Sequence, residues 1–122
     1  MNPGWIAQDE FDRVVADAFE TLPGWVREAM RDVAIMVEDE PPDGAGPEHG
    51  LLLGMYHGVP LTRRGARAAG SMPDSIVLYR RPILRAVRRR ADVSDRVRAV
   101  LLHEIGHAMG MTEARLREMG VH

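Results

Sequence analysis

The residues best suited to chemistry in this 122-residue chain are residues 103–107, which read HEIGH and so have the form HExxH. Apolar residues at helical spacing around the motif predict that it lies within a helix. His103 and His107 are four residues apart, so they lie on one helix face and both imidazoles can reach one metal ion. The longer side chain of Glu104 can reach a water molecule on that ion without binding the ion. Two histidines, a carboxylate base and an open coordination position are the parts of a hydrolytic zinc site.

A catalytic zinc ion needs a third protein ligand. The donors among the 15 residues after His107 are Glu113, Glu118 and His122. The motif continues as HExxHxxGxxE, and Gly110 is predicted to end the helix in a left-handed conformation that turns the chain back. Glu113 has the right spacing for that turn, whereas Glu118 lies over a turn further along and His122 is terminal.

The alternative is that His103 and His107 are ordinary histidines on a packing face and that Glu104 is merely exposed. Chance produces an HExxH run in roughly 1 in 70 chains of this composition, so the run alone is weak evidence. The glycine at the helix end and the carboxylate three residues later argue against chance. We therefore expect His103, His107 and Glu113 to bind Zn²⁺ and Glu104 to be the catalytic residue.

The elements that must position this motif are predicted to form an α+β fold. The predicted helices cover residues 9–22, 24–30, 82–90, 94–109 and 113–119, and the predicted strands cover residues 33–37, 51–56 and 75–79. Pro82 suits the first turn of its helix, and Ser94 is a suitable N-cap for the helix that carries the motif. The length and the absence of a linker predict one domain over residues 1–122.

Composition excludes several classes of protein. The chain is 45% hydrophobic and 28% charged, as is usual for a folded soluble protein. It has no cysteine, which excludes disulfides, thiolate zinc fingers and a cysteine nucleophile. The N-terminal residues have neither the basic start nor the apolar run of a signal peptide, and no stretch is long enough for a membrane span. We therefore expect a cytoplasmic protein with no membrane contact.

Charge is divided unevenly along the chain. Residues 1–58 carry 12 acidic residues and 3 arginines, whereas residues 59–98 carry 11 arginines and 3 aspartates. Six of these arginines fall within Arg80–Arg90, which could contact nucleic acid or an acidic partner. No Phe or Trp lies among them to stack on bases, so we expect no nucleic-acid partner. The alternative is a solvated helix face that meets the acidic half within the fold or across a homodimer.

From about residue 9 to residue 116, the sequence resembles the minimal zincins, a family of short bacterial single-domain zinc metallopeptidases. The resemblance rests on the HExxHxxG run and on three further segments, residues 37–41 (VEDEP), 53–61 (LGMYHGVPL) and 73–80 (PDSIVLYR). It implies a zincin-like fold in which a small three-stranded sheet packs on the HExxH helix. The family often has Asp at the position of Glu113. There is no room for the separate methionine turn of larger zincins.

The resemblance and the motif together predict a zinc metallopeptidase acting on a peptide or protein substrate. Glu104 would take a proton from the attacking water and pass it to the leaving nitrogen. A second electrophile is usually needed, and the candidates are Tyr79, Tyr56, His57 and His49. Residues 75–79 resemble a zincin edge strand, against which an extended peptide could pair. Asp39 and Glu40 could help to hold the metal-binding side chains in place without binding the ion themselves.

A second interpretation is a zincin-like domain, metal-bound or metal-free, that acts as a regulator or adaptor. Metal content and turnover that depends on Glu104 distinguish the two interpretations.

Overall fold

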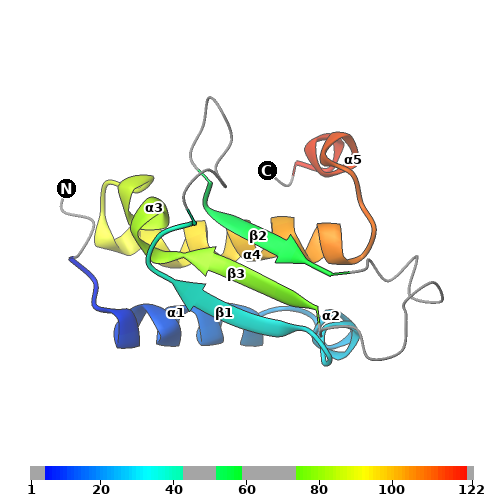
Figure 1. Ribbon diagram of the computed structural model, residues 1–122, viewed down its shortest axis with the longest axis horizontal. Helices are drawn as coiled ribbons and strands as arrows, with labels where there is room; N and C mark the ends of the chain where they lie inside the picture. The colour runs from blue at the N-terminus through cyan, green and yellow to red at the C-terminus, as the bar shows by residue number, and fades with distance from the viewer. Residues whose placement is uncertain (1–4, 43–51, 59–73, 121–122) are drawn as a thin grey trace.

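A three-stranded mixed sheet lies at the centre of the computed structural model, with its principal helices on one face (Figure 1). The structure describes residues 5–42, 52–58 and 74–120. The elements are α1 (Gln8–Glu20), α2 (Gly24–Ala29), β1 (Ala34–Glu38), β2 (Gly54–His57), β3 (Ser75–Tyr79), α3 (Arg80–Arg85), the 3₁₀ turn η2 (Arg90–Asp92), α4 (Val93–Ala108) and α5 (Glu113–Glu118). The predicted α+β class is confirmed.

The strand order is β1-β3-β2, with β1 parallel and β2 antiparallel to β3. The prediction that residues 75–79 form a substrate-binding edge strand is therefore wrong, because β3 is the central strand. Its last four residues, Ile76 to Tyr79, are all buried, as expected for a strand covered on both faces. The edge strand beside the HExxH helix is β2, which packs against α4.

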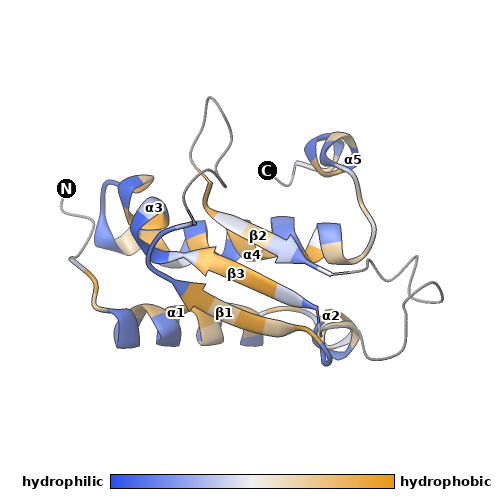
Figure 2. Cartoon of the chain, viewed as in Figure 1, coloured by the Kyte–Doolittle hydropathy of each residue, from blue (hydrophilic) through white to orange (hydrophobic). Residues whose placement is uncertain are grey.

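The core forms where α1 and α4 pack together on the sheet. It contains Phe11 and Val15 of α1, Ile76 and Leu78 of β3, and Val97, Leu101 and Ile105 of α4. Figure 2 shows the strongly hydrophobic colouring of β1 and of the middle of β3, next to the mixed colouring of α1. The apolar face of α4 thus packs against the sheet. The orientation of the helix, and with it the direction in which its polar side chains point, is fixed by this packing.

Helix α4 begins at Val93, so its N-cap position is Asp92, two residues before the predicted N-cap Ser94. The Asp92 carboxylate makes no capping bond. It accepts two hydrogen bonds from the Arg89 guanidinium instead, each 3.0 Å long. Helix α3 begins at Arg80 and ends at Arg85, short of the predicted end at residue 90. The predicted strand over 51–56 forms at Gly54–His57, and residue 51 lies outside the described residues.

The acidic and basic halves of the chain meet within the fold. Arg80, only 6% exposed, donates to Asp39 Oδ1 at 2.8 Å and to the Ile6 carbonyl. Arg85 pairs with Glu40 at 2.9 Å. Asp39 and Glu40 therefore anchor α3 through Arg80 and Arg85. A third such pair joins Arg90 to Glu10.

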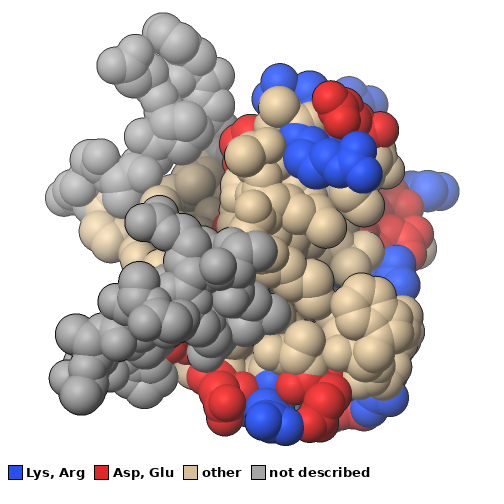
Figure 3. Space-filling view, turned by 90° about the vertical axis from the view of Figure 1, so that its right-hand side faces the viewer, with Lys and Arg blue, Asp and Glu red and all other residues tan. Residues whose placement is uncertain are grey.

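The surface shows the same mixing of charge. On the face viewed in Figure 3, basic and acidic side chains lie next to one another at the upper and lower margins, with uncharged residues between them. The predicted absence of a nucleic-acid partner and the homodimer alternative stay predictions. In the described part of the chain, no helix is long and apolar enough to cross a membrane.

Candidate metal centre

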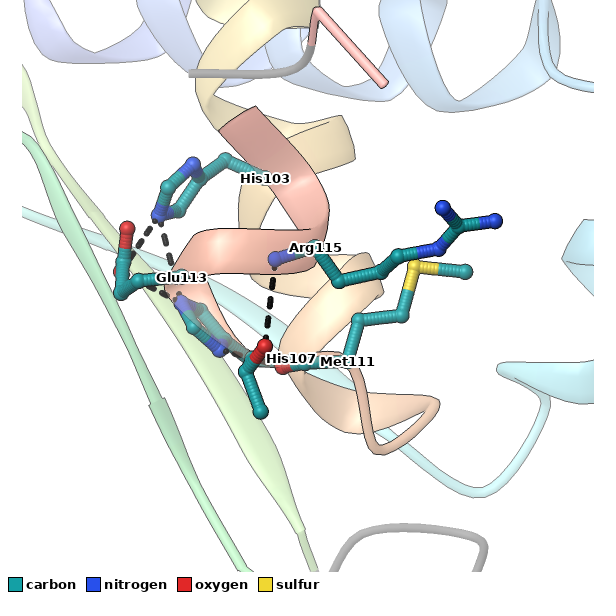
Figure 4. Close-up of polar contacts among 6 residues, drawn as sticks. His103, His107, Met111, Glu113 and Arg115 are labelled. Atoms are coloured by element: carbon teal, nitrogen blue, oxygen red, sulfur yellow. Dashed lines mark hydrogen bonds and ion pairs between the residues drawn. The ribbon is translucent and has the colours of Figure 1, made fainter. Parts of the chain in front are cut away.

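Helix α4 presents both motif histidines on one face, and Glu113 from α5 completes a cluster with them. The Nε2 atoms of His103 and His107 are 3.2 Å apart. Oε1 of Glu113 lies 2.9 Å from His103 Nε2 and 2.7 Å from His107 Nε2. Figure 4 shows these three side chains pointing toward one another. The structure thus brings together the three residues that the sequence predicts as metal ligands.

The turn between α4 and α5 brings Glu113 back to the histidines. Gly110 has a φ of 94°, which favours glycine, so the predicted left-handed helix end is confirmed. The N–H of Gly110 donates to the His107 carbonyl, and the N–H of Met111 donates to the Gly106 carbonyl, both at 2.9 Å. These two bonds form a Schellman motif. Thr112 then caps α5, its hydroxyl accepting from the Arg115 N–H at 3.1 Å.

The hydrogen bonding of His107 indicates what the cluster can bind. Its Nδ1 lies 3.0 Å from the Met111 carbonyl, which can only accept, so Nδ1 carries the hydrogen. In a neutral imidazole, Nε2 then carries no hydrogen. Its lone pair faces a carboxylate oxygen of Glu113, and the two atoms are 2.7 Å apart. Two acceptors this close repel each other unless a proton or a metal cation lies between them. A hydrogen bond from Nδ1 to a backbone carbonyl is also the usual support of a metal-binding histidine.

The spacing of the three atoms suits a zinc ion. Tetrahedral zinc with ordinary bond lengths keeps its ligand atoms about 3.3 Å apart. The observed separations of 2.7–3.2 Å are shorter than this by about 0.1 to 0.6 Å, so the three side chains would move slightly apart around an ion. Two imidazoles and one carboxylate form a donor set typical of catalytic zinc. Of the other predicted donors, Glu118 pairs with Arg115 and His122 lies outside the described residues.

Glu104 is not part of the cluster but lies beside it, buried to 7% exposure between α4 and β2. Burial raises the pKa of its carboxyl group, and the nearby His103 and His107 act in the opposite direction. The backbone N–H of Tyr56 on β2 also hydrogen-bonds to this carboxylate. Glu104 is therefore not an incidental surface residue. A buried carboxylate with a shifted pKa in a cleft is a typical feature of functional sites.

Gly54 allows β2 to approach α4 at this point. A Cβ atom there would lie 2.9 Å from Val100 Cγ1, 3.1 Å from the Val77 carbonyl oxygen and 3.4 Å from Glu104 Cγ. The backbone of β2 is therefore in close contact with the helix that carries the motif. This contact brings the Tyr56 N–H to Glu104.

A cleft of about 560 Å³ runs between β2 and the motif. Its lining includes Leu52, Gly54, Met55 and Tyr56 on the β2 side, and Glu104, His107, Met111 and Glu113 on the α4–α5 side. The Tyr79 N–H donates to the Leu53 carbonyl at 2.9 Å. This bond fixes which residues along β2 direct their backbone N–H and carbonyl groups toward β3 and which direct them away. By that alternation, the backbone groups of Gly54 and Tyr56 point away from β3.

The four candidate electrophiles differ in position. Tyr56 lines the cleft, and its hydroxyl donates to Asp74 Oδ2 at 2.7 Å. Tyr79 is only 2% exposed within the sheet, where burial raises the pKa of its hydroxyl. His57 is exposed and does not line the cleft. His49 lies outside the described residues.

Comparison with known proteins identifies the family. Residues 30–121, which are 92 of the 122 residues, match the sequence model of the zincin-like metallopeptidases. The chain belongs to this family. The predicted resemblance is thereby confirmed, and membership implies zinc binding at a site such as the His103, His107 and Glu113 cluster.

The fold is shared with a solved structure of a conserved hypothetical protein from Thermo thermophilus. The two chains are 24% identical, with a TM-score of 0.55 over 81% of this chain and 90% of that one. At this identity the likeness shows the fold alone. A comparison with curated proteins found no match. The predicted zincin-like arrangement, a small sheet packed on the HExxH helix, is confirmed.

Proposed function

We propose that this zincin-like protein is a zinc-dependent peptidase, with His103, His107 and Glu113 as the zinc ligands and Glu104 as the general base. One observation carries the proposal. The three donor atoms lie within 4.8 Å of one another, and two of the donor residues, His107 and Glu113, line a cleft together with the buried carboxylate of Glu104 and residues of β2. Ligands, base and a place for a peptide are the components that metal-assisted peptide hydrolysis needs.

The chemistry is divided between the ion and the protein. Bound zinc supplies Lewis acidity, which polarises a peptide carbonyl and lowers the pKa of a water molecule. Glu104 accepts the proton of the attacking water and later returns it to the leaving nitrogen. The hydrogen bond from the Tyr56 N–H holds the carboxylate in place between β2 and α4. Tyr56 is a candidate second electrophile because it lines the same cleft, and to act in this role its hydroxyl would have to exchange its hydrogen bond to Asp74 Oδ2 for one to the substrate.

The substrate proposed is an extended peptide that pairs with the outer edge of β2. Gly54 presents its backbone N–H and carbonyl at that edge, whereas the Tyr56 N–H is already bonded to Glu104; a peptide that pairs at Gly54 passes Glu104 and His107. This places substrate binding on β2, in contrast to the assignment to residues 75–79 that the sequence suggested.

The replacement of Glu104 by Gln tests the proposal. Gln has nearly the same shape but cannot accept the proton, so zinc content should be retained while peptide turnover falls by about 10²- to 10⁴-fold. Turnover is measured on a pool of fluorogenic peptides, with zinc per chain measured on the same samples. His107→Ala is the matched control and should lose both zinc and turnover. Turnover that is unchanged in Glu104→Gln would refute the assigned base.

A further inference from the structure

Helix α5, which carries Glu113, buries one side chain in the protein. Of its six residues, only Leu116 is buried, at 2% exposure. The other five are exposed, and the side chain of Glu113 itself is 58% exposed. The position of the Glu113 carboxylate therefore depends on how Leu116 docks.

Leu116 docks on α4 at Gly106, which lies between the two motif histidines. A Cβ atom at Gly106 would lie 2.4 Å from Leu116 Cδ2 and 3.3 Å from both Cδ1 and Cγ. Rotation of the Leu116 side chain can move Cδ2, but Cγ at 3.3 Å would still have to shift by a few tenths of an ångström. A side chain at residue 106 would therefore displace Leu116 from its present contact with α4.

The backbone does not explain glycine at this position. Gly106 lies inside a regular helix and is not among the residues with positive φ. Glycine is a poor helix former, so its use here has a cost in helix stability. The observation that accounts for it is the space taken by Leu116.

We propose that Gly106 and Leu116 are positioning residues for the third metal ligand. Because Gly106 has no side chain, Leu116 can pack directly on α4 at this position. This contact positions the Glu113 carboxylate next to His103 and His107. The contact acts together with the turn at Gly110, whose bond from the Met111 N–H ends on the Gly106 carbonyl. The inference rests on the proposed metal site and adds to it a determinant of metal affinity.

The experiment measures zinc affinity by competition with a chromogenic chelator, independently of peptidase activity. Gly106→Ala should weaken zinc binding by about 10- to 100-fold, as is typical when a ligand loses its support. Leu116→Ala removes the same contact without altering α4 and should weaken it similarly. Gly24→Ala in α2 is the matched control, because a Cβ there would have only Arg27 Nη2 nearby, at 3.9 Å. It should leave zinc affinity unchanged.

A second measurement distinguishes positioning of Glu113 from damage to α4. In a Glu113→Ala background, the further change Gly106→Ala should have no additional effect on zinc affinity. An equal loss in both backgrounds would overturn the proposal, because Gly106 would then act through the histidines. Unchanged affinity in Gly106→Ala alone would also overturn it. Wild-type protein that binds no zinc would instead refute the metal site itself, and with it the proposed function.

Discussion

The tight contact between β2 and α4 predicts a specific effect of Gly54→Ala. The new Cβ would meet Val100 Cγ1 at 2.9 Å and the Val77 carbonyl oxygen at 3.1 Å. Neither neighbour is free to move, because Val100 is buried in the core and Val77 belongs to the central strand. Overpacking of this kind typically costs about 1–3 kcal/mol. We expect the free energy of unfolding to fall by about 2 kcal/mol.

The same substitution should lower stability and disturb the position of the proposed base while leaving zinc affinity unchanged. The third contact of the new Cβ is Glu104 Cγ at 3.4 Å, so β2 and the proposed base are displaced relative to each other. The metal ligands lie on α4 and α5 and are not contacted, so zinc affinity should stay within about twofold of wild type, well below the 10-fold loss expected for a disturbed ligand support.

Urea unfolding of the metal-free protein and chelator competition measure these two quantities. Gly24→Ala is the control and should change stability by less than about 1 kcal/mol. An unfolding free energy for Gly54→Ala equal to that of wild type would refute the tight β2–α4 packing. A large loss of zinc affinity would refute the separation of the metal ligands from β2.

Two further predictions concern stability. Gly110→Ala should destabilise the protein by about 1–2 kcal/mol in urea unfolding, because alanine is strained at a φ of 94°; an unchanged midpoint would contradict the left-handed turn. Asp39 has a lowered pKa because Arg80 donates a hydrogen bond to its carboxylate, so its contribution is present above its unfolded-state pKa and is lost as the pH falls through the lower folded-state value. The stability advantage of wild type over Asp39→Asn should therefore shrink as the pH falls below about 4, and an advantage that grows on acidification would show that the sign is wrong.

The metal cluster could be predicted from sequence because its geometry is local. Helical spacing places His103 and His107 on one face, and the positive φ of Gly110 turns the chain within three residues of Glu113. These features depend on short-range rules of helix geometry and helix ends. They do not require knowledge of the sheet.

The strand order could not be predicted in the same way. Pairing of β3 with both β1 and β2 joins segments that are far apart in the chain, and an apolar run fits either an edge or a centre when read alone. The sequence shows only that Ile76–Tyr79 are apolar, and their burial, which marks the central strand, is seen in the structure. The burial of Glu104 and its bond from the Tyr56 N–H follow from the position of β2, so they also appear only in the folded structure.

The N-cap of α4 shows a competition that local propensity does not include. Ser94 is a suitable cap by type, but the helix already begins at Val93. The Asp92 carboxylate, which could have capped it, is paired with Arg89. Helix α4 follows directly on the 3₁₀ turn Arg90–Asp92 and has no side-chain cap, so the preference for serine at helix starts predicted this boundary incorrectly.

The most direct test of the account is the amount of zinc bound per chain in tag-free protein, measured beside a His107→Ala control. We predict about one equivalent in the wild type and its loss in the control, as expected for a single three-ligand site. A folded wild-type protein that contains no zinc even after reconstitution would contradict the metal centre. That result would favour the alternative that the domain is a regulator or adaptor.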